Sequence, residues 1–204
     1  MLTTANERLF LALNAPAHPD VLTVTLAWLA ASWLIYVAAA VVPALWIWGR
    51  HTARGALLVT VLGVGAALSV NQLLGLLWYE PRPFMIGLGH TLAFHAVENS
   101  FPSDHATFMW SLGFALITTG AARTWGTLVC FAGLLIAWSR IYLGLHFPVD
   151  MTASFLIGVA GGGLAGAALP VGERWLQPVA LHTYEVMLRS LRLPPSLFPR
   201  GPER

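Results

Sequence analysis

Long apolar stretches separated by short polar connections dominate this sequence. The apolar runs cover residues 21–48, 56–78, 105–120, 124–143 and 148–169. A helix needs about 20 apolar residues to cross the hydrocarbon core of a bilayer, and the third run lies near the lower limit. The pattern therefore predicts an all-α, polytopic membrane protein with about five transmembrane helices, or six.

Both ends of the chain predict helices of a different kind. Leu9, Phe10 and Leu13 recur at helical spacing in a segment too short to span. Such a segment is typical of an amphipathic helix lying in the membrane interface. Residues 175–191 predict a second amphipathic helix along the membrane surface. The run at 148–169 is rich in glycine, which favours close packing between membrane helices.

The composition supports a membrane protein and argues against nucleic-acid binding. Only 10% of the residues are charged, whereas soluble domains carry about 25%. All 11 basic residues are arginines, and they lie in separate connections, so no basic face is predicted for DNA or RNA. The single cysteine, Cys130, lies in an apolar run and has no internal partner for a disulfide.

The arginines also predict the orientation of the chain. With five spans, Arg50, Arg54, Arg123 and the arginine-bearing tail after residue 172 all fall on one side of the membrane. The positive-inside rule makes that side cytoplasmic. The polar interval at residues 80–104 and the break after the fourth span then lie together on the extracytoplasmic face.

Three short sequences on that face carry the candidate chemistry. They are Tyr-Glu-Pro-Arg-Pro-Phe at 79–84, Ser-Phe-Pro-Ser-Asp-His at 100–105, and the stretch 138–150. The last contains Arg140, His146 and Asp150. An arginine binds phosphoryl oxygens through paired hydrogen bonds, a histidine can attack phosphorus, and an aspartate can orient that histidine. Ionisable groups at membrane depth are costly, so this cluster favours a functional site.

Together the three sequences resemble the type-2 phosphatidic acid phosphatase (PAP2) superfamily. They look most like its bacitracin-resistance branch, the undecaprenyl-diphosphate phosphatases. The family's third motif, Ser-Arg, five residues, His, three residues, Asp, is complete as Ser139-Arg140, His146 and Asp150. The resemblance covers about residues 56–170, which we expect to form the catalytic core of a single domain spanning residues 1–204.

The other two motifs depart from the family pattern. The second motif, Pro-Ser-Gly-His, has Asp104 in place of glycine. The first motif, a lysine, six residues and Arg-Pro, keeps Arg82-Pro83 but has Gly75 at the lysine position. We interpret Gly75 as leaving room for a diphosphate or a prenyl chain, while two arginines bind the phosphate.

The resemblance implies a role for each member of the site. His146 would attack the terminal phosphorus and form a phosphohistidine, which divides hydrolysis into two steps. Asp150 would hold the other ring nitrogen of His146 and select its tautomer. His105 would donate a proton to the leaving lipid phosphate.

The phosphate-binding group is implied in the same way. Arg82 and Arg140 would neutralise the transferring oxygens. Ser103 and the amides at the start of the third span would add donors. Asp104 is favoured as a cap of that helix over a catalytic role, and Glu80 either pairs with an arginine or faces water. No metal or cofactor is expected, because the arginines would take the place of magnesium.

Two further groups of polar residues have open interpretations. His90, His95 and Glu98 contain metal-ligating side chains, but their spacing fits no regular site. Contacts with solvent or lipid headgroups are therefore favoured for them. Asn71 lies inside the second span, where a hydrogen bond between helices is favoured over substrate contact.

The implied function is hydrolysis of undecaprenyl diphosphate to undecaprenyl phosphate, the lipid carrier of envelope sugars, from the outer face of a bacterial inner membrane. Resistance to bacitracin would follow. The partners would be the polyprenyl diphosphate and membrane lipids, and the oligomeric state stays open. The alternatives are a glycerolipid phosphatase, acting on phosphatidylglycerophosphate or phosphatidate, and a lipid phosphotransferase. A transporter or flippase is disfavoured because no inverted repeat is evident.

Overall fold

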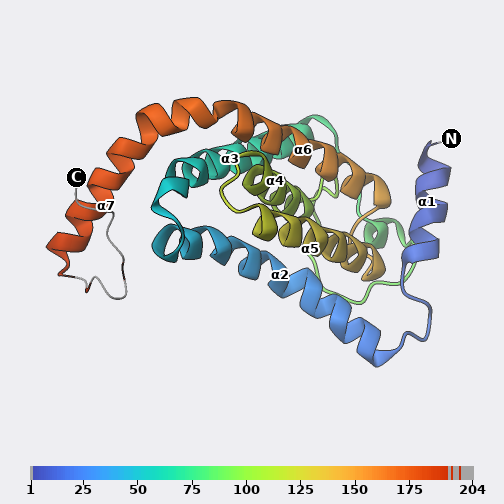
Figure 1. Ribbon diagram of the computed structural model, residues 1–204. Coiled ribbons are helices and arrows are strands. Elements are labelled where there is room, and N and C mark those ends of the chain that lie inside the picture. The colour runs from blue at the N-terminus through green and yellow to red at the C-terminus, as the bar shows by residue number, and fades with distance from the viewer. Residues whose placement is uncertain (1, 193, 195–197, 199–204) are drawn as a thin grey trace.

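The computed structural model describes residues 2–192, 194 and 198, and all regular structure in these residues is helical. Figure 1 shows the arrangement. The helices are α1 (Leu2–Leu13), α2 (Val21–Trp48), α3 (Arg54–Leu77), α4 (Asp104–Thr118), α5 (Arg123–Tyr142), α6 (Pro148–Val171) and α7 (Gln177–Ser190). Two 3₁₀ turns (η1, His51–Ala53; η2, Pro83–Ile86) and a π-helical turn (η3, Gly172–Leu176) complete them. The predicted all-α class is confirmed.

Within the described part of the chain, four helical stretches are long and apolar enough to cross a membrane: Val21–Trp48, His51–Leu77, Arg123–Tyr142 and Pro148–Ser190. The third expected span, 105–120, is the shorter helix α4, which has 15 residues. Its length of about 22 Å is less than the roughly 30 Å of a hydrocarbon core. The chain leaves the helix early because Gly120 adopts a left-handed backbone, with φ of 69°, in the turn before α5.

Helix α4 is the centre of the bundle. It packs against α3, α5 and α6, and Figure 1 shows it enclosed by these three helices. Met109, Leu112 and Leu116 are almost completely buried within the main apolar cluster. A helix that is surrounded by protein does not have to span the hydrocarbon core, because its neighbours shield its backbone and side chains from lipid.

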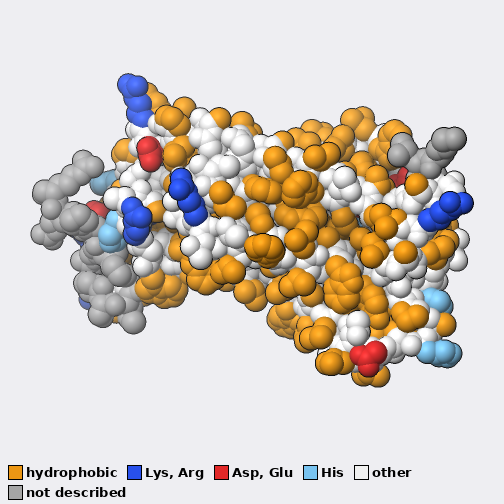
Figure 2. Space-filling view, turned by 45° about the vertical axis from the view of Figure 1, so that its right-hand side comes forward, with side chains coloured by type: hydrophobic (Ala, Val, Ile, Leu, Met, Phe, Trp, Pro, Cys, Tyr) orange, Lys and Arg blue, Asp and Glu red, His pale blue; other side chains and the backbone are white. Residues whose placement is uncertain are grey.

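The surface agrees with a multi-pass membrane protein. In Figure 2 hydrophobic side chains form a broad belt over the middle of the visible face, and charged side chains gather at its two ends. Large side chains such as Leu76, Phe131 and Leu156 are more than half exposed. Exposed apolar area of this extent is stable in lipid, where it needs no burial against protein.

The terminal helices have more protein contacts than the sequence predicts for interfacial helices. Phe10 of α1 packs edge to face on Phe147, with ring centroids 5.3 Å apart. Asn14 donates to the carbonyls of His90 and Tyr142 at 2.9 Å. Helix α1 is thereby fixed to the two connections that form the site.

At the other end of the molecule, α7 is held by a buried cation. The guanidinium of Arg54 lies over the rings of Trp46 and Tyr184, at 5.4 and 4.7 Å from their centroids. Arg54 was expected among the charges of a connection, but it is the first residue of α3 and only 1% exposed. Cation–π contacts offset part of the cost of burying it.

The glycines of α6 allow the closest helix contact in the core. A Cβ added at Gly162 would lie against the Cβ of Phe114 and 2.8 Å from the carbonyl carbon of the same residue on α4. At the next position, Gly163, an added Cβ would meet nothing within 4 Å. The same added methyl group therefore meets backbone in one case and open space in the other.

We expect Gly162→Ala to destabilise the protein and Gly163→Ala to leave it unchanged or stabilise it. Overpacking of this kind costs about 1–3 kcal/mol, and it exceeds the gain in helix propensity of roughly 1 kcal/mol that both variants share. Thermal unfolding of the two purified variants in the same detergent measures the difference. Equal unfolding midpoints of the two variants would show that α4 and α6 are not tightly packed at Gly162.

Candidate active site

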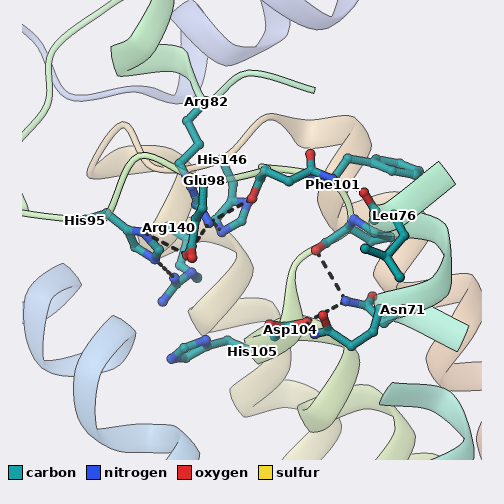
Figure 3. A pocket seen from close by; sticks show the side chains of 14 residues that line it. Asn71, Leu76, Arg82, His95, Glu98, Phe101, Asp104, His105, Arg140 and His146 are labelled. Carbon is teal, nitrogen blue, oxygen red and sulfur yellow. Dashed lines mark hydrogen bonds and ion pairs between the residues drawn. The ribbon is translucent and has the colours of Figure 1, made fainter. Parts of the chain in front are cut away.

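The three predicted sequences meet at one end of the bundle, around a cavity of about 270 Å³. Arg82 comes from the connection after α3, His105 from the first turn of α4, and Arg140 from the last turn of α5. His146 lies between α5 and α6. Figure 3 shows the side chains pointing into this cavity, with His105 across from Arg82 and His146.

His146 has a defined tautomer. Its Nε2 lies 3.0 Å from Nη1 of Arg82, and its Nδ1 lies 3.2 Å from Oδ2 of Asp150. An arginine only donates hydrogen bonds, so Nε2 accepts and Nδ1 carries the proton that it donates to Asp150. The lone pair of Nε2 therefore lies at the cavity, and it becomes available to a nucleophilic attack when Arg82 exchanges this hydrogen bond for one with a phosphoryl oxygen.

The environment of His146 also keeps the ring neutral. Its side chain is almost completely buried, and burial lowers its pKa well below the usual value of 6.5. The nearby guanidinium groups of Arg140 and Arg82 lower the pKa further. A neutral imidazole retains the lone pair at physiological pH, whereas an imidazolium has none to give.

Asp150 is held in place from three sides. It is the third residue of α6, and its Oδ2 accepts from the backbone N–H of Phe147 at 2.9 Å. The hydroxyl of Ser100 donates to the same oxygen at 2.5 Å. A carboxylate near a helix N-terminus is stabilised by the helix dipole as well. These contacts orient the oxygen that receives the Nδ1 proton of His146.

Arg82 is buried and held mainly by the backbone. Its Nη1 donates to the carbonyl of Leu145 at 3.1 Å, and its Nη2 donates to the carbonyl of Asn99 at 3.1 Å. Glu98 accepts a further hydrogen bond from Nη2 at 3.2 Å. Burial is the main cause that lowers the pKa of Arg82, and Glu98 opposes it. The guanidinium is thus fixed beside Nε2 of His146, where phosphoryl oxygens would lie during an attack.

Arg140 lines the cavity beside His95. It is 4% exposed, and its Nη2 lies 3.2 Å from Nε2 of His95. Its Nε is buried without a hydrogen-bond partner among the described residues. A buried cation with so few partners is costly, and an anion in the cavity would supply the missing contacts.

Asp104 does not cap α4 as expected. The residue before the helix is Ser103, and Asp104 is the first helical residue. Its Oδ1 accepts from Asn71 at 2.6 Å and from Gln72 at 2.8 Å, so the carboxylate joins α4 to α3. The expected hydrogen bond between helices at Asn71 is confirmed. Asp104 and Asn71 also line the cavity.

Ser103 and Glu80 are not among the residues that line the cavity. The backbone N–H of Ser103 donates to Ser154 at 2.9 Å, which fixes the start of α4 against α6. The backbone N–H of Glu80 donates to the side chain of Asn99 at 2.9 Å. The carboxylate paired with Arg82 is that of Glu98, and the salt bridges of the described chain include none to Glu80.

His95 and Glu98 are the residues that sequence reasoning missed. They were expected to contact solvent or headgroups, but both line the cavity. Within the described residues no group that includes them has the arrangement of a metal site. Their loop has no periodic pattern and no family motif, so only their residue types could have drawn attention. His90, the other histidine of this loop, instead bonds the carbonyl of Ala15 at 3.0 Å.

Comparison with known proteins agrees with this geometry. The family model described as "PAP2 superfamily" matches residues 54–169. The chain is 35% identical over 162 residues to "Putative undecaprenyl-diphosphatase YbjG" of Escherichia coli (strain K12), covering 79% of this chain and 81% of that protein. It is 33% identical over 154 residues to "Undecaprenyl-diphosphatase BcrC" of Bacillus subtilis (strain 168), covering 76% and 79% of the two chains.

The fold is also similar to that of a solved structure. The crystal structure of Aquifex aeolicus LpxE superposes with a TM-score of 0.63 and 26% identity, covering 79% of this chain and 94% of that chain. The family model matches more than half of the sequence, and its matched segment contains every residue that lines the cavity. The chain belongs to the PAP2 superfamily.

Proposed function

We propose that this protein is an integral membrane phosphatase that hydrolyses undecaprenyl diphosphate to undecaprenyl phosphate and inorganic phosphate. One observation carries the proposal: the lone pair of His146 Nε2 faces a cavity, oriented by Asp150 through Nδ1 and flanked by a buried arginine. The relatives named undecaprenyl-diphosphatase, each matched over most of the chain, support the choice of substrate. The whole chain acts as one domain whose catalytic core is residues 56–170.

The first step is transfer of the terminal phosphoryl group to His146. Nε2 forms a bond to phosphorus while the bond from phosphorus to the bridging oxygen breaks. His105, which the bound diphosphate holds in its protonated form, delivers a proton to that oxygen, and undecaprenyl phosphate leaves. Arg82 exchanges its hydrogen bond with Nε2 for one with a phosphoryl oxygen, and Arg140 binds another. Asp150 keeps the Nδ1 proton in place and stabilises the positive charge that develops on the ring.

The second step releases phosphate. Water attacks the phosphorus of phosphohistidine, the nitrogen–phosphorus bond breaks, and the electron pair returns to Nε2 of His146. His105, which lost its proton in the first step, accepts one from the attacking water. The site returns to its starting protonation state after one phosphate has left, so no external acid or base is consumed.

We place the site on the extracytoplasmic side of a bacterial inner membrane. The argument is the positive-inside rule applied to Arg50, Arg123 and the tail. Phe94, which precedes the cavity-lining residue His95 in the chain, is 99% exposed and suits a labelling test. A Phe94→Cys variant in a Cys130→Ser background should react with an impermeant maleimide in intact cells. Labelling only after lysis would reverse the assignment.

Phosphate release by the purified protein tests the proposed substrate. Undecaprenyl diphosphate should be turned over in preference to phosphatidylglycerophosphate and phosphatidate, and activity should persist in a chelator, because arginines bind the phosphoryl oxygens. A clear preference for a glycerolipid would overturn the substrate assignment. A phosphorylated acceptor lipid in place of free phosphate would identify a phosphotransferase.

Gly75 provides a prediction about the size of the site. It lines the cavity, and a Cβ added there would lie 3.4 Å from Asn99 Nδ2 and from the carbonyl oxygen of Phe101. The methyl group added in Gly75→Ala would therefore make an ordinary contact, and this variant should change turnover little. We expect Gly75→Lys to lower turnover of undecaprenyl diphosphate several-fold, because its long side chain occupies space that the diphosphate needs. A several-fold gain in the lysine variant would disprove the need for space.

A further inference from the structure

His95 and Glu98 link the two phosphate-binding arginines. Glu98 Oε1 lies 3.2 Å from Nη2 of Arg82 and 3.4 Å from Nδ1 of His95. His95 Nε2 in turn lies 3.2 Å from Nη2 of Arg140. Figure 3 shows this chain of contacts along one side of the cavity. The carboxylate of Glu98 therefore occupies a position that a phosphoryl oxygen would take on Arg82.

Glu98 is the part of this chain that can leave. Its side chain is 56% exposed, whereas the side chain of Arg82 is 5% exposed. Arg82 also keeps its hydrogen bonds to the carbonyls of Leu145 and Asn99 without Glu98. An incoming phosphate can thus replace the carboxylate while the guanidinium stays in place.

The charges that line the cavity require such an exchange. With neutral histidines, the two arginines Arg82 and Arg140 are balanced by the two carboxylates Glu98 and Asp104. A terminal phosphate alone carries about −1.5 to −2 charges at pH 7, and the inner phosphate of a diphosphate adds another. Moving Glu98 into solvent removes one negative charge, protonation of His105, which its role as proton donor requires, adds one positive charge, and protonation of a second histidine adds another.

The tautomer of His95 identifies the group that gains this proton. Arg140 only donates, so Nε2 of His95 accepts from it, and Nδ1–H points to the carbonyl of Ala96 at 3.3 Å and to Glu98. A phosphoryl oxygen that reaches Nη2 of Arg140 also reaches Nε2 of His95. The lone pair of Nε2 would repel this oxygen, whereas an Nε2–H would bind it.

We propose that His95 and Glu98 form a part of the phosphate site that rearranges when substrate binds, an inference that rests on the proposed function. Substrate displaces Glu98 from Arg82, and His95 then takes one proton from solvent and donates an Nε2–H hydrogen bond to a phosphoryl oxygen beside Arg140. The pair favours highly charged lipid diphosphates, because only a strongly anionic ligand both displaces the carboxylate and holds the added proton.

The surroundings of His95 set the direction of its titration. Burial and the charge of Arg82 lower its pKa below 6.5 in the free protein, Arg140 acts in the same direction, and Glu98 opposes them. The other ionisable groups facing this end of the cavity are His105, Asp104 and His146. A bound phosphate raises the pKa of His95. Binding therefore takes up a proton, and KM rises with pH between the free and the bound pKa.

Steady-state hydrolysis of undecaprenyl diphosphate between about pH 5 and 8 tests the proposal. We expect His95→Gln to raise KM about tenfold at neutral pH, the value of one charge-assisted hydrogen bond, with a smaller change in kcat. Its KM should rise less steeply with pH than that of the wild type, and titration of the substrate cancels in this comparison. The matched control is His90→Gln, in the same loop but away from the cavity.

Glu98→Gln is expected to change KM in the opposite direction. It distinguishes displacement of Glu98 by the substrate from a role of Glu98 in supporting Arg82. The variant loses the competing charge, so KM should fall about two- to fivefold. If Glu98 only supported Arg82, KM would rise instead. An increase in KM in Glu98→Gln, or pH profiles of wild type and His95→Gln that run parallel with equal KM, would each overturn the proposal.

Failure of the proposed function gives a different result. A wild-type protein that does not hydrolyse undecaprenyl diphosphate rejects that function, independently of His95. Calorimetry of inorganic diphosphate binding then tests the exchange directly in buffers of different ionisation enthalpy. Proton uptake should be greater in the wild type than in His95→Gln, and equal uptake would contradict the proposal.

Discussion

Replacing His146 with alanine is expected to lower the rate of phosphate release by on the order of 10⁴-fold or more. The loss is large because the covalent route depends on one lone pair, that of Nε2, which lies 3.0 Å from Nη1 of Arg82. No other described group occupies this position between Arg82 and Asp150. Phosphate release from undecaprenyl diphosphate by the purified variant measures the effect.

The His146 experiment needs a control that separates chemistry from folding. His182, exposed on α7 at the opposite end of the molecule, provides it, and His182→Ala should retain wild-type activity. Both variants should be recovered from the membrane fraction in equal yield with similar thermal unfolding. Phosphate release that is unchanged in a folded His146→Ala protein would reject His146 as the nucleophile.

Replacing Asp150 with asparagine is expected to lower kcat about 10³-fold while the protein stays folded. The Oδ2 atom of Asp150 accepts from His146 Nδ1, Ser100 Oγ and the N–H of Phe147. An asparagine that keeps the bond to Phe147 has no second charged oxygen for the imidazolium. It also permits the tautomer whose proton lies on Nε2, which cannot attack phosphorus.

Ser100→Ala is the matched comparison for Asp150. It removes the hydrogen bond from Ser100 to this oxygen and the 3.3 Å contact between Ser100 Oγ and His146 Nδ1, but it keeps the charge of Asp150 and the contact between Asp150 and His146. A loss of about tenfold is therefore expected. A small effect of Asp150→Asn, equal to that of Ser100→Ala, would show that the charge of Asp150 contributes little. Asp150→Glu is not expected to retain wild-type activity, because its longer side chain moves the carboxylate away from the place that Oδ2 has at the first turn of α6.

The site at residues 138–150 was predictable because its geometry is local. His146 and Asp150 are separated by 4 residues where α6 begins, so the first helical turn brings them together. Arg140 precedes them in the last turn of α5. A motif whose members lie within about one or two turns of each other carries its geometry in its spacing.

The contacts that complete the site are long-range. Arg82 meets His146 across 64 residues, Ser100 meets Asp150 across 50, and Arg140 meets His95 across 45. The loop that supplies His95 is positioned by contacts such as Leu92 N–H to the carbonyl of Leu143 at 3.0 Å. Nothing in the residue pattern of this loop predicts that partner.

The sequence by itself determined the helical class, the apolar segments and the candidate site residues within each short motif. Hydrophobic length and local spacing act within one segment, so they can be recognised without the fold. Only the tertiary structure decided that α4 is a short, enclosed helix, that Asp104 binds α3, and that Glu98 and not Glu80 pairs with Arg82. These outcomes depend on how separate segments pack together, because a polar group on an aperiodic loop bonds to the partner that packing brings near it.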